Sequence, residues 1–141
     1  MTQENIPEKP PSLQQEIVLF HSAYGLRPAV LQWAQRLRDA GCIVHTPDLY
    51  DGEVFSDRMD AVRKIQQLGF DGMLARAQQS VAHLRSDLFY AGFSNGGACA
   101  ELLGATRPGG PWRHSDARAF ADSRSRLAIV ACDCSCPGAF C

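Results

Sequence analysis

The stretch LFYAGFSNGGACAEL, residues 88–102, decides how the fold is predicted. An apolar run stops at Gly92, a serine follows at Ser94, and after Gly96 an apolar-periodic segment begins at once. This order predicts a strand that runs into a helix through a sharp turn, so that the serine oxygen projects from the carboxyl edge of a sheet. Glycines at the two flanking positions let the strand and the helix approach each other without a Cβ clash.

Ser94 lies within the pattern G-x-S-x-G, which is typical of a turn that presents a nucleophile. The first N–H groups of the following helix point to the same place, where the helix dipole carries about half a positive charge. Such donors stabilise a developing oxyanion, so the pattern favours a serine hydrolase. Two alternatives stay open: a turn that only packs, and a non-catalytic α/β domain that binds phosphate or a partner. The phosphate-binding patterns G-x-G-x-x-G and G-x-x-x-x-G-K fit less well, because Ser94 takes a glycine position and no lysine follows.

Strands and helices also alternate upstream of this stretch. Proline suits the first turn of a helix and glycine its end, and Pro28 and Gly41 bound an apolar-periodic segment in this way. Alternation of this kind predicts parallel strands joined by right-handed crossovers, hence an α/β fold with a mostly parallel sheet and flanking helices. The predicted strands are 17–20, 42–47 and 88–91, and the predicted helices are 28–40, 62–68, 73–84 and 98–105.

Composition narrows the class of protein. A chain of 141 residues with 45% hydrophobic residues fits one domain with one core. The net charge of −1 offers no basic field to attract nucleic acid or anionic lipid. No apolar run approaches the roughly 18 residues that a membrane helix needs, and the start of the chain is polar. We therefore expect a soluble, cytoplasmic protein that binds neither nucleic acid nor membrane; the sequence leaves its oligomeric state open.

The chain divides into three parts by composition. Residues 1–14 are polar and contain two adjacent prolines, which predicts a loose arm, and residues 15–108 carry the α/β pattern. From residue 109 onward helix-length periodicity is lost and cysteines gather near the end. A metal site there is an alternative, but zinc sites prefer two to four residues between paired cysteines, so no metal is predicted. The cysteines in question are Cys132, Cys134, Cys136 and Cys141.

Isolated histidines and cysteines upstream of Ser94, or just after it, are predicted to pack in the fold rather than to take part in catalysis. His21, His45 and His83 each stand alone, and a lone histidine is more often a packing residue than a base. Cys42 and Cys99 sit in apolar segments, where free cysteine behaves as a small buried hydrophobe.

Three segments together resemble the dienelactone hydrolase family of α/β-hydrolases: IVLFHSAYGL at 17–26, GCIVHTPDLYDGEVF at 41–55 and YAGFSNGGACAELL at 90–103. The resemblance implies an esterase or lactonase that acts on small carboxylic ester substrates without a cofactor. It places the nucleophile on Ser94 and the oxyanion donors on the backbone N–H groups of Ala23 and Asn95. Cysteine-bearing members often have an acidic residue at the position of Ser22, whose absence here favours a plain serine esterase.

The chain departs from the family pattern after Ser94. The family order is nucleophile, aspartate, histidine, whereas the histidine that follows Ser94 here, His114, precedes the candidate aspartates. His114 is therefore rejected as the general base. We interpret residues 109–141 as an out-of-frame tail, so that C-terminal strands and helices of the fold are missing, together with the triad Asp and His. A serine without a base is a weak nucleophile, which predicts weak activity or none. The aspartates that follow His114 are Asp116, Asp122 and Asp133.

Overall fold

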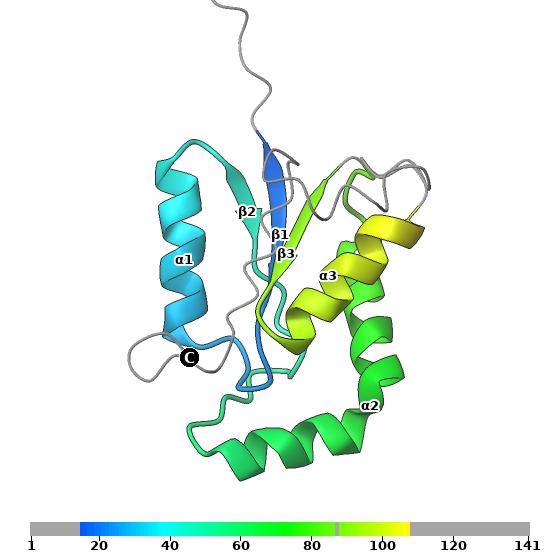
Figure 1. The fold of residues 1–141 in the computed structure, drawn as a ribbon. Helices are drawn as coiled ribbons and strands as arrows, with labels where there is room; N and C mark the ends of the chain where they lie inside the picture. The colour runs from blue at the N-terminus through cyan, green and yellow to red at the C-terminus, as the bar shows by residue number, and fades with distance from the viewer. Residues whose placement is uncertain (1–14, 87, 108–141) are drawn as a thin grey trace, which may run out of the picture.

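The structure is a computed structural model that describes residues 15–86 and 88–107 (Figure 1). The predicted arm at 1–14 and tail at 109–141 lie outside the described residues, as do His114 and the cysteines of the tail. Within the described ranges, strands and helices alternate as predicted. Their order is β1 (Glu16–Phe20), α1 (Pro28–Asp39), β2 (Ile43–His45), α2 (Arg58–Val81), β3 (Phe89–Gly92) and α3 (Asn95–Thr106).

The strands form one parallel sheet with β1 at its centre. The strand order is β2-β1-β3, and both pairings are parallel. Val18 of β1 lies opposite His45 of β2 and Tyr90 of β3, which aligns the carboxyl ends of β1 and β3. The predicted α/β class with a parallel sheet and flanking helices is therefore confirmed for the described part of the chain.

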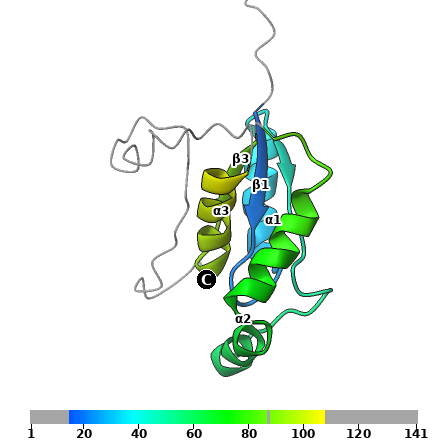
Figure 2. The same cartoon turned by 90° about the vertical axis from the view of Figure 1, so that its right-hand side faces the viewer.

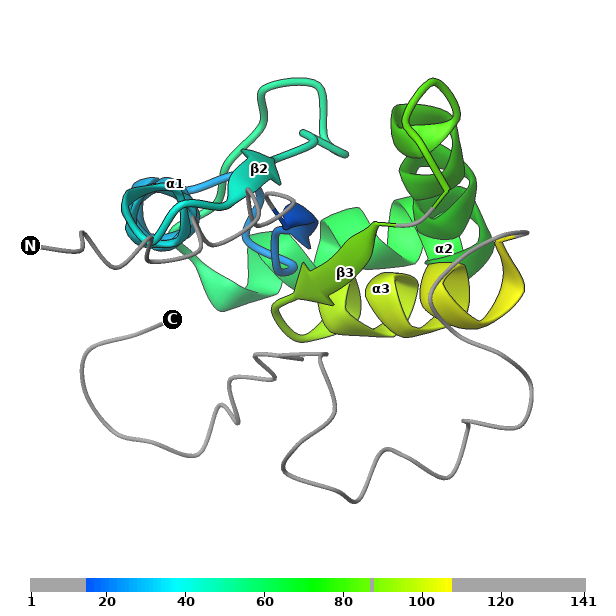
Figure 3. The same cartoon turned by 90° about the horizontal axis from the view of Figure 1, so that it is seen from above.

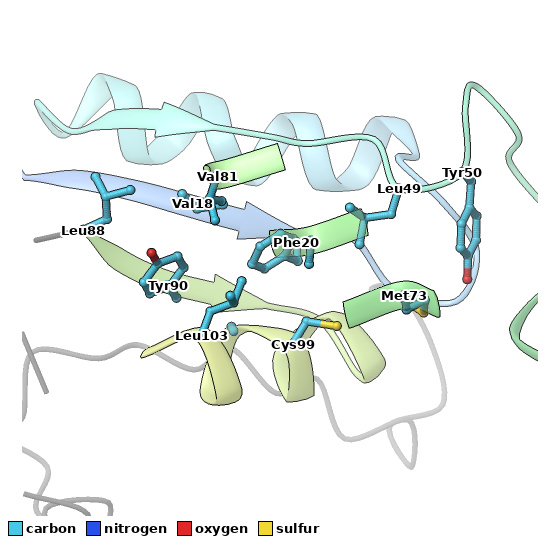
Figure 4. Packing of buried hydrophobic residues seen from close by; sticks show 12 residues of the cluster. Val18, Phe20, Leu49, Tyr50, Met73, Val81, Leu88, Tyr90, Cys99 and Leu103 are labelled. Atoms are coloured by element: carbon cyan, nitrogen blue, oxygen red, sulfur yellow. The ribbon is translucent and has the colours of Figure 1, made fainter. Parts of the chain in front are cut away.

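Helices cover both faces of this sheet (Figures 1 and 3). Side chains alternate between the faces of a strand, so Leu19 and Ala91 meet α1, whereas Val18, Phe20 and Tyr90 meet α2 and α3. Figure 4 shows the larger cluster, between the sheet and the last two helices. That cluster consists of Val18, Phe20, Leu49, Tyr50, Met73, Ala77, Val81, Leu88, Tyr90, Cys99, Ala100 and Leu103.

The cysteines of the body lie in these apolar layers. Cys99 is fully buried, and burial raises the pKa of its thiol to about 11, so it behaves as the predicted small hydrophobe. Cys42 is half-buried and packs against the cluster under α1.

A break divides α2 at Gly69, which has φ 66° and ψ 164°. Only glycine adopts this conformation without a steric penalty, and the helix changes direction there, as Figures 1 and 2 show. The break separates the two helices that were predicted over 62–68 and 73–84. The first begins earlier than predicted because the Asp57 carboxylate accepts hydrogen bonds from the N–H groups of Met59 and Asp60, at 2.8 and 3.1 Å.

Several predicted boundaries need correction. Strand β2 ends at His45 rather than at residue 47, because Pro47 has no N–H to continue a ladder. Helix α3 begins at Asn95 rather than at residue 98, because the turn at Ser94 is so sharp that helical backbone starts directly after it. None of the helices in the described ranges is long and apolar enough to cross a membrane.

Candidate active site

The turn between β3 and α3 holds Ser94 in a strained conformation. Its φ of 52° and ψ of −120° lie where a residue with a side chain is rarely found, at a cost of about 1–3 kcal/mol. The surrounding backbone imposes this conformation: Phe93 N–H donates to Phe20 O at 3.1 Å, and Gly96 N–H donates to Phe93 O at 2.9 Å. The Ser94 side chain is exposed at the carboxyl end of β3. The predicted strand, sharp turn and helix are confirmed.

Close approach of strand and helix explains the two glycines of the turn. A Cβ at Gly92 would overlap the backbone of Gly96 and lie 2.6 Å from the Gly97 nitrogen. A Cβ at Gly96 would overlap the carbonyl oxygen of His21 and lie 3.0 Å from the Cβ of Phe20. Both positions therefore require glycine, as the sequence pattern predicted.

A second turn follows β1 at the same edge of the sheet. It is closed by the Gly25 N–H, which donates to Ser22 O at 3.1 Å, and by the Tyr24 N–H, which donates to Ser22 Oγ at 3.3 Å. In the residues that the structure describes, neither the Ala23 N–H nor the Asn95 N–H donates to an acceptor. The two amides predicted as oxyanion donors are thus available at the ends of neighbouring strands.

His21 is a structural residue, as predicted. It is completely buried, and its Nε2 accepts a hydrogen bond from the Leu49 N–H at 2.9 Å. The proton of the neutral ring therefore lies on Nδ1, which donates to Ser22 O at 2.7 Å. Burial lowers the pKa of His21 and keeps it neutral. The ring joins the turn after β1 to the loop after β2.

No base for Ser94 is found among residues 15–86 and 88–107, where no side chain hydrogen-bonds to its Oγ. His45 pairs with Glu16 at 2.7 Å on the sheet. His83 is exposed, so its predicted packing role is wrong; it follows the last turn of α2, where its side chain reaches solvent. The described ranges also contain no cluster of three or more potential metal ligands.

The loop after β2, which contacts His21, is held by hydrogen bonds within itself and to α2. The Asp48 carboxylate accepts from the N–H groups of Tyr50 and Gly52, at 2.9 and 2.8 Å. Arg76 of α2 donates to Leu49 O at 2.8 Å and to the Asp51 carboxylate at 2.9 Å. No site role was predicted for Tyr50; its signal in the sequence is the segment 47–50, which contributes to the family resemblance.

Comparison with known proteins identifies the family of the chain. The model of the dienelactone hydrolase family matches residues 4–109. The chain belongs to the dienelactone hydrolase family. A search of curated proteins found no significant match.

Two solved structures share the fold of this family member. One is a dienelactone hydrolase-like promiscuous phosphotriesterase from metagenomic libraries, at 27% identity and a TM-score of 0.55, and the match covers 64% of this chain and 42% of that one. The other, named m3DLH, is 22% identical with a TM-score of 0.50 and the same two coverages. The chain therefore spans less than half the length of either protein.

Proposed function

We propose that this chain carries the nucleophile half of a hydrolase site for small carboxylic esters or lactones. The observation that supports it best is the conformation of Ser94, an exposed serine kept at positive φ by the turn. Strain of this kind persists where the surrounding fold enforces it, and it is concentrated at active sites. A turn that serves packing alone has no need of it, because a glycine would relieve the strain.

In the proposed reaction, Ser94 Oγ attacks the carbonyl carbon of the ester; the C–O bond to the alcohol then breaks, the alcohol leaves with a proton, and water hydrolyses the acyl group on Oγ to the free acid. Negative charge moves to the carbonyl oxygen, where the Ala23 and Asn95 N–H groups and the amino end of α3 stabilise it. The hydroxyl proton must leave at the same time. The described residues supply no acceptor for it, so attack relies on water and is slow.

Organophosphorus compounds suit the same site, because attack on phosphorus also places negative charge on an oxygen that the two amides can stabilise. The phosphotriesterase among the similar structures acts on this kind of centre. A fluorophosphonate is therefore a suitable probe for Ser94. Its fluoride is displaced, and the phosphorus forms a stable bond to Oγ.

Labelling with this probe, followed by peptide mass spectrometry, tests the proposal. We expect a slow adduct on Ser94 that is absent in Ser94→Ala and unchanged in Ser56→Ala, which removes an exposed serine of the loop before α2. An intact fold with no adduct on Ser94 after prolonged incubation would contradict the proposal.

The second candidate is a non-catalytic site that binds a phosphate group. Two unoccupied amide donors without a base favour it. Inorganic phosphate would then shift the amide resonances of Ala23 and Asn95 in NMR spectra, while the fluorophosphonate left Ser94 unmodified.

A further inference from the structure

The peptide group between Ser22 and Ala23 carries one of the two predicted oxyanion donors, the Ala23 N–H, and its carbonyl oxygen is bound from two sides. His21 Nδ1 donates to Ser22 O at 2.7 Å, and the Gly25 N–H donates to the same oxygen at 3.1 Å. A carbonyl oxygen has two lone pairs, so both are used. Because a peptide group is planar, these two bonds fix the orientation of the Ala23 N–H as well.

The orientation of this peptide plane decides where the Ala23 N–H points. None of the peptide bonds in the described ranges is cis, so the N–H of this group points opposite to its C=O. The C=O points to the His21 ring, which is completely buried. The Ala23 N–H therefore points away from the buried ring, and Ala23 itself is half-buried. A hydrogen bond to the carbonyl also polarises the peptide, which strengthens its N–H as a donor.

The His21 ring is held by contacts on its other side. Its Nε2 accepts from the Leu49 N–H at 2.9 Å, and the ring meets the Tyr50 ring in a T-shaped arrangement with centroids 4.8 Å apart. The Asp48 carboxylate lies 3.9 Å from Nε2, beyond hydrogen-bond distance, so it does not hold the ring proton at that nitrogen. The loop after β2 thus sets both the tautomer and the orientation of the ring.

The backbone of His21 touches the turn that carries Ser94. A Cβ at Gly96 would overlap the His21 carbonyl oxygen, so the turn after β1 and the turn after β3 are in direct contact. His21 therefore contacts the Ser94 turn through its backbone and the Ala23 peptide through its ring. One residue links the nucleophile turn to a predicted oxyanion donor.

We propose that His21 is a positioning residue of the Ser94 site, whose Nδ1–H holds Ser22 O and so directs the Ala23 N–H to the place where negative charge develops. The proposal rests on the proposed function. His21 acts through Ala23 and takes no proton from Ser94. Misdirected donors lower the rate of attack, because they stabilise charge only at the right distance and angle. Removing the Nδ1 donor should therefore slow the chemical step and leave binding of the probe unchanged.

Two substitutions separate the two hydrogen bonds of the ring. His21→Asn places a side-chain N–H near the position of Nδ1, so it can donate to Ser22 O but is too short to reach Leu49. His21→Gln extends to the position of Nε2, where its oxygen can accept from the Leu49 N–H, and it has no donor at the position of Nδ1. Both variants lose the ring contact with Tyr50, so each controls for the loss of packing in the other.

Fluorophosphonate labelling of Ser94 in the full chain is the readout. We expect His21→Gln to lower the maximal labelling rate about tenfold at a constant half-saturating concentration, and His21→Asn to stay within about threefold of wild type. His83→Gln, at an exposed position, should label at the wild-type rate. Equal rates in folded His21→Asn and His21→Gln would overturn the proposal, because the rate would then not depend on the bond to Ser22 O.

NMR of the wild-type chain covers the case in which neither variant folds. A hydrogen bond from His21 Nδ1 to Ser22 O produces a scalar coupling between that nitrogen and the Ser22 carbonyl carbon. Its presence supports the proposal, and its absence overturns it.

The outcomes also separate this inference from the proposed function. Absence of wild-type labelling at Ser94 overturns the proposed function, and the amide resonance of Ala23 then decides the role of His21. A resonance that moves in His21→Gln and returns toward its wild-type position in His21→Asn supports that role. A resonance at one position in all three proteins overturns it.

Discussion

The Leu49 N–H donates to His21 Nε2 at 2.9 Å, across 28 positions of the chain. This bond exists only while the imidazole is neutral, because a protonated ring has no acceptor. The neutral form is favoured by complete burial, which lowers the pKa of His21 from 6.5. Protonation would place an unpaired donor against the Leu49 N–H, where the turn after β1 contacts the loop after β2.

We therefore predict that stability falls in mild acid. Below pH 6.5 the unfolded chain binds a proton on His21 before the folded chain does, so the free energy of unfolding decreases as pH falls toward the lowered pKa. One proton gives a slope of at most about 1.4 kcal/mol per pH unit. Urea denaturation between pH 8 and pH 5 measures it. Above pH 6.5 this contribution is complete and constant.

The matched controls are His21→Gln and His83→Gln. Glutamine at position 21 offers an oxygen to the Leu49 N–H without titrating, so the acid slope should become shallower. His83 is exposed, and its replacement should leave the slope as it is. An identical acid slope in wild type and His21→Gln would show that another group dominates.

Arg107 ties the end of α3 to the end of α2. Its Nη2 donates to Val81 O at 2.7 Å and to Leu84 O at 2.5 Å, and its Nη1 donates to Tyr90 Oη at 2.7 Å. Because one guanidinium satisfies several acceptors, we expect Arg107→Ala to lower the free energy of unfolding by about 2 kcal/mol. Chemical denaturation checks this value. Arg63→Ala, which removes an exposed ion pair with Asp60, should cost less than about 0.5 kcal/mol.

Two glycine-to-alanine substitutions, one at the turn and one within α2, should change the free energy of unfolding in opposite directions. Gly96→Ala places a methyl group into the His21 carbonyl, so the strand and helix must separate; we expect a loss of more than about 3 kcal/mol. Gly72→Ala within α2 meets Leu68 Cβ at 3.7 Å, an ordinary contact, and should stabilise the chain by about 0.5–1 kcal/mol. Thermal unfolding distinguishes them, and a stable Gly96→Ala would refute the close packing.

An added base should accelerate attack by Ser94. Hydrolysis of an aryl ester by this chain should be weak, because the described residues hold no proton acceptor next to Oγ. Free imidazole should raise the rate in wild type above the rate in Ser94→Ala at the same imidazole concentration. Equal rates in the two proteins would mean that Ser94 takes no part. Fast turnover without imidazole would reveal a base outside the described residues.

The interpretation of residues 109–141 as an out-of-frame tail stays a prediction. It is checked by the nucleotide sequence across the codons of Arg107 to Pro111, where we expect a shift of frame. Genes of close relatives that encode the same tail in an unbroken frame would contradict it.

Local patterns in the sequence were sufficient for the class of fold and for the place of Ser94. The apolar run before Gly92, the glycines around the serine and the helical periodicity after it each involve neighbouring residues, and backbone sterics act at that range. Strand ends were less well predicted. The end of β2 was predicted two residues late, although Pro47 has no N–H with which to continue the ladder.

Tertiary structure alone decided how the site is supported. The His21 ring contacts both the Leu49 N–H and the Tyr50 ring, and the Arg107 guanidinium contacts the carbonyls at the end of α2. These contacts join residues between about twenty and thirty positions apart. They arise only when the parallel strands bring their carboxyl ends together, because no local periodicity determines which distant side chains then become neighbours.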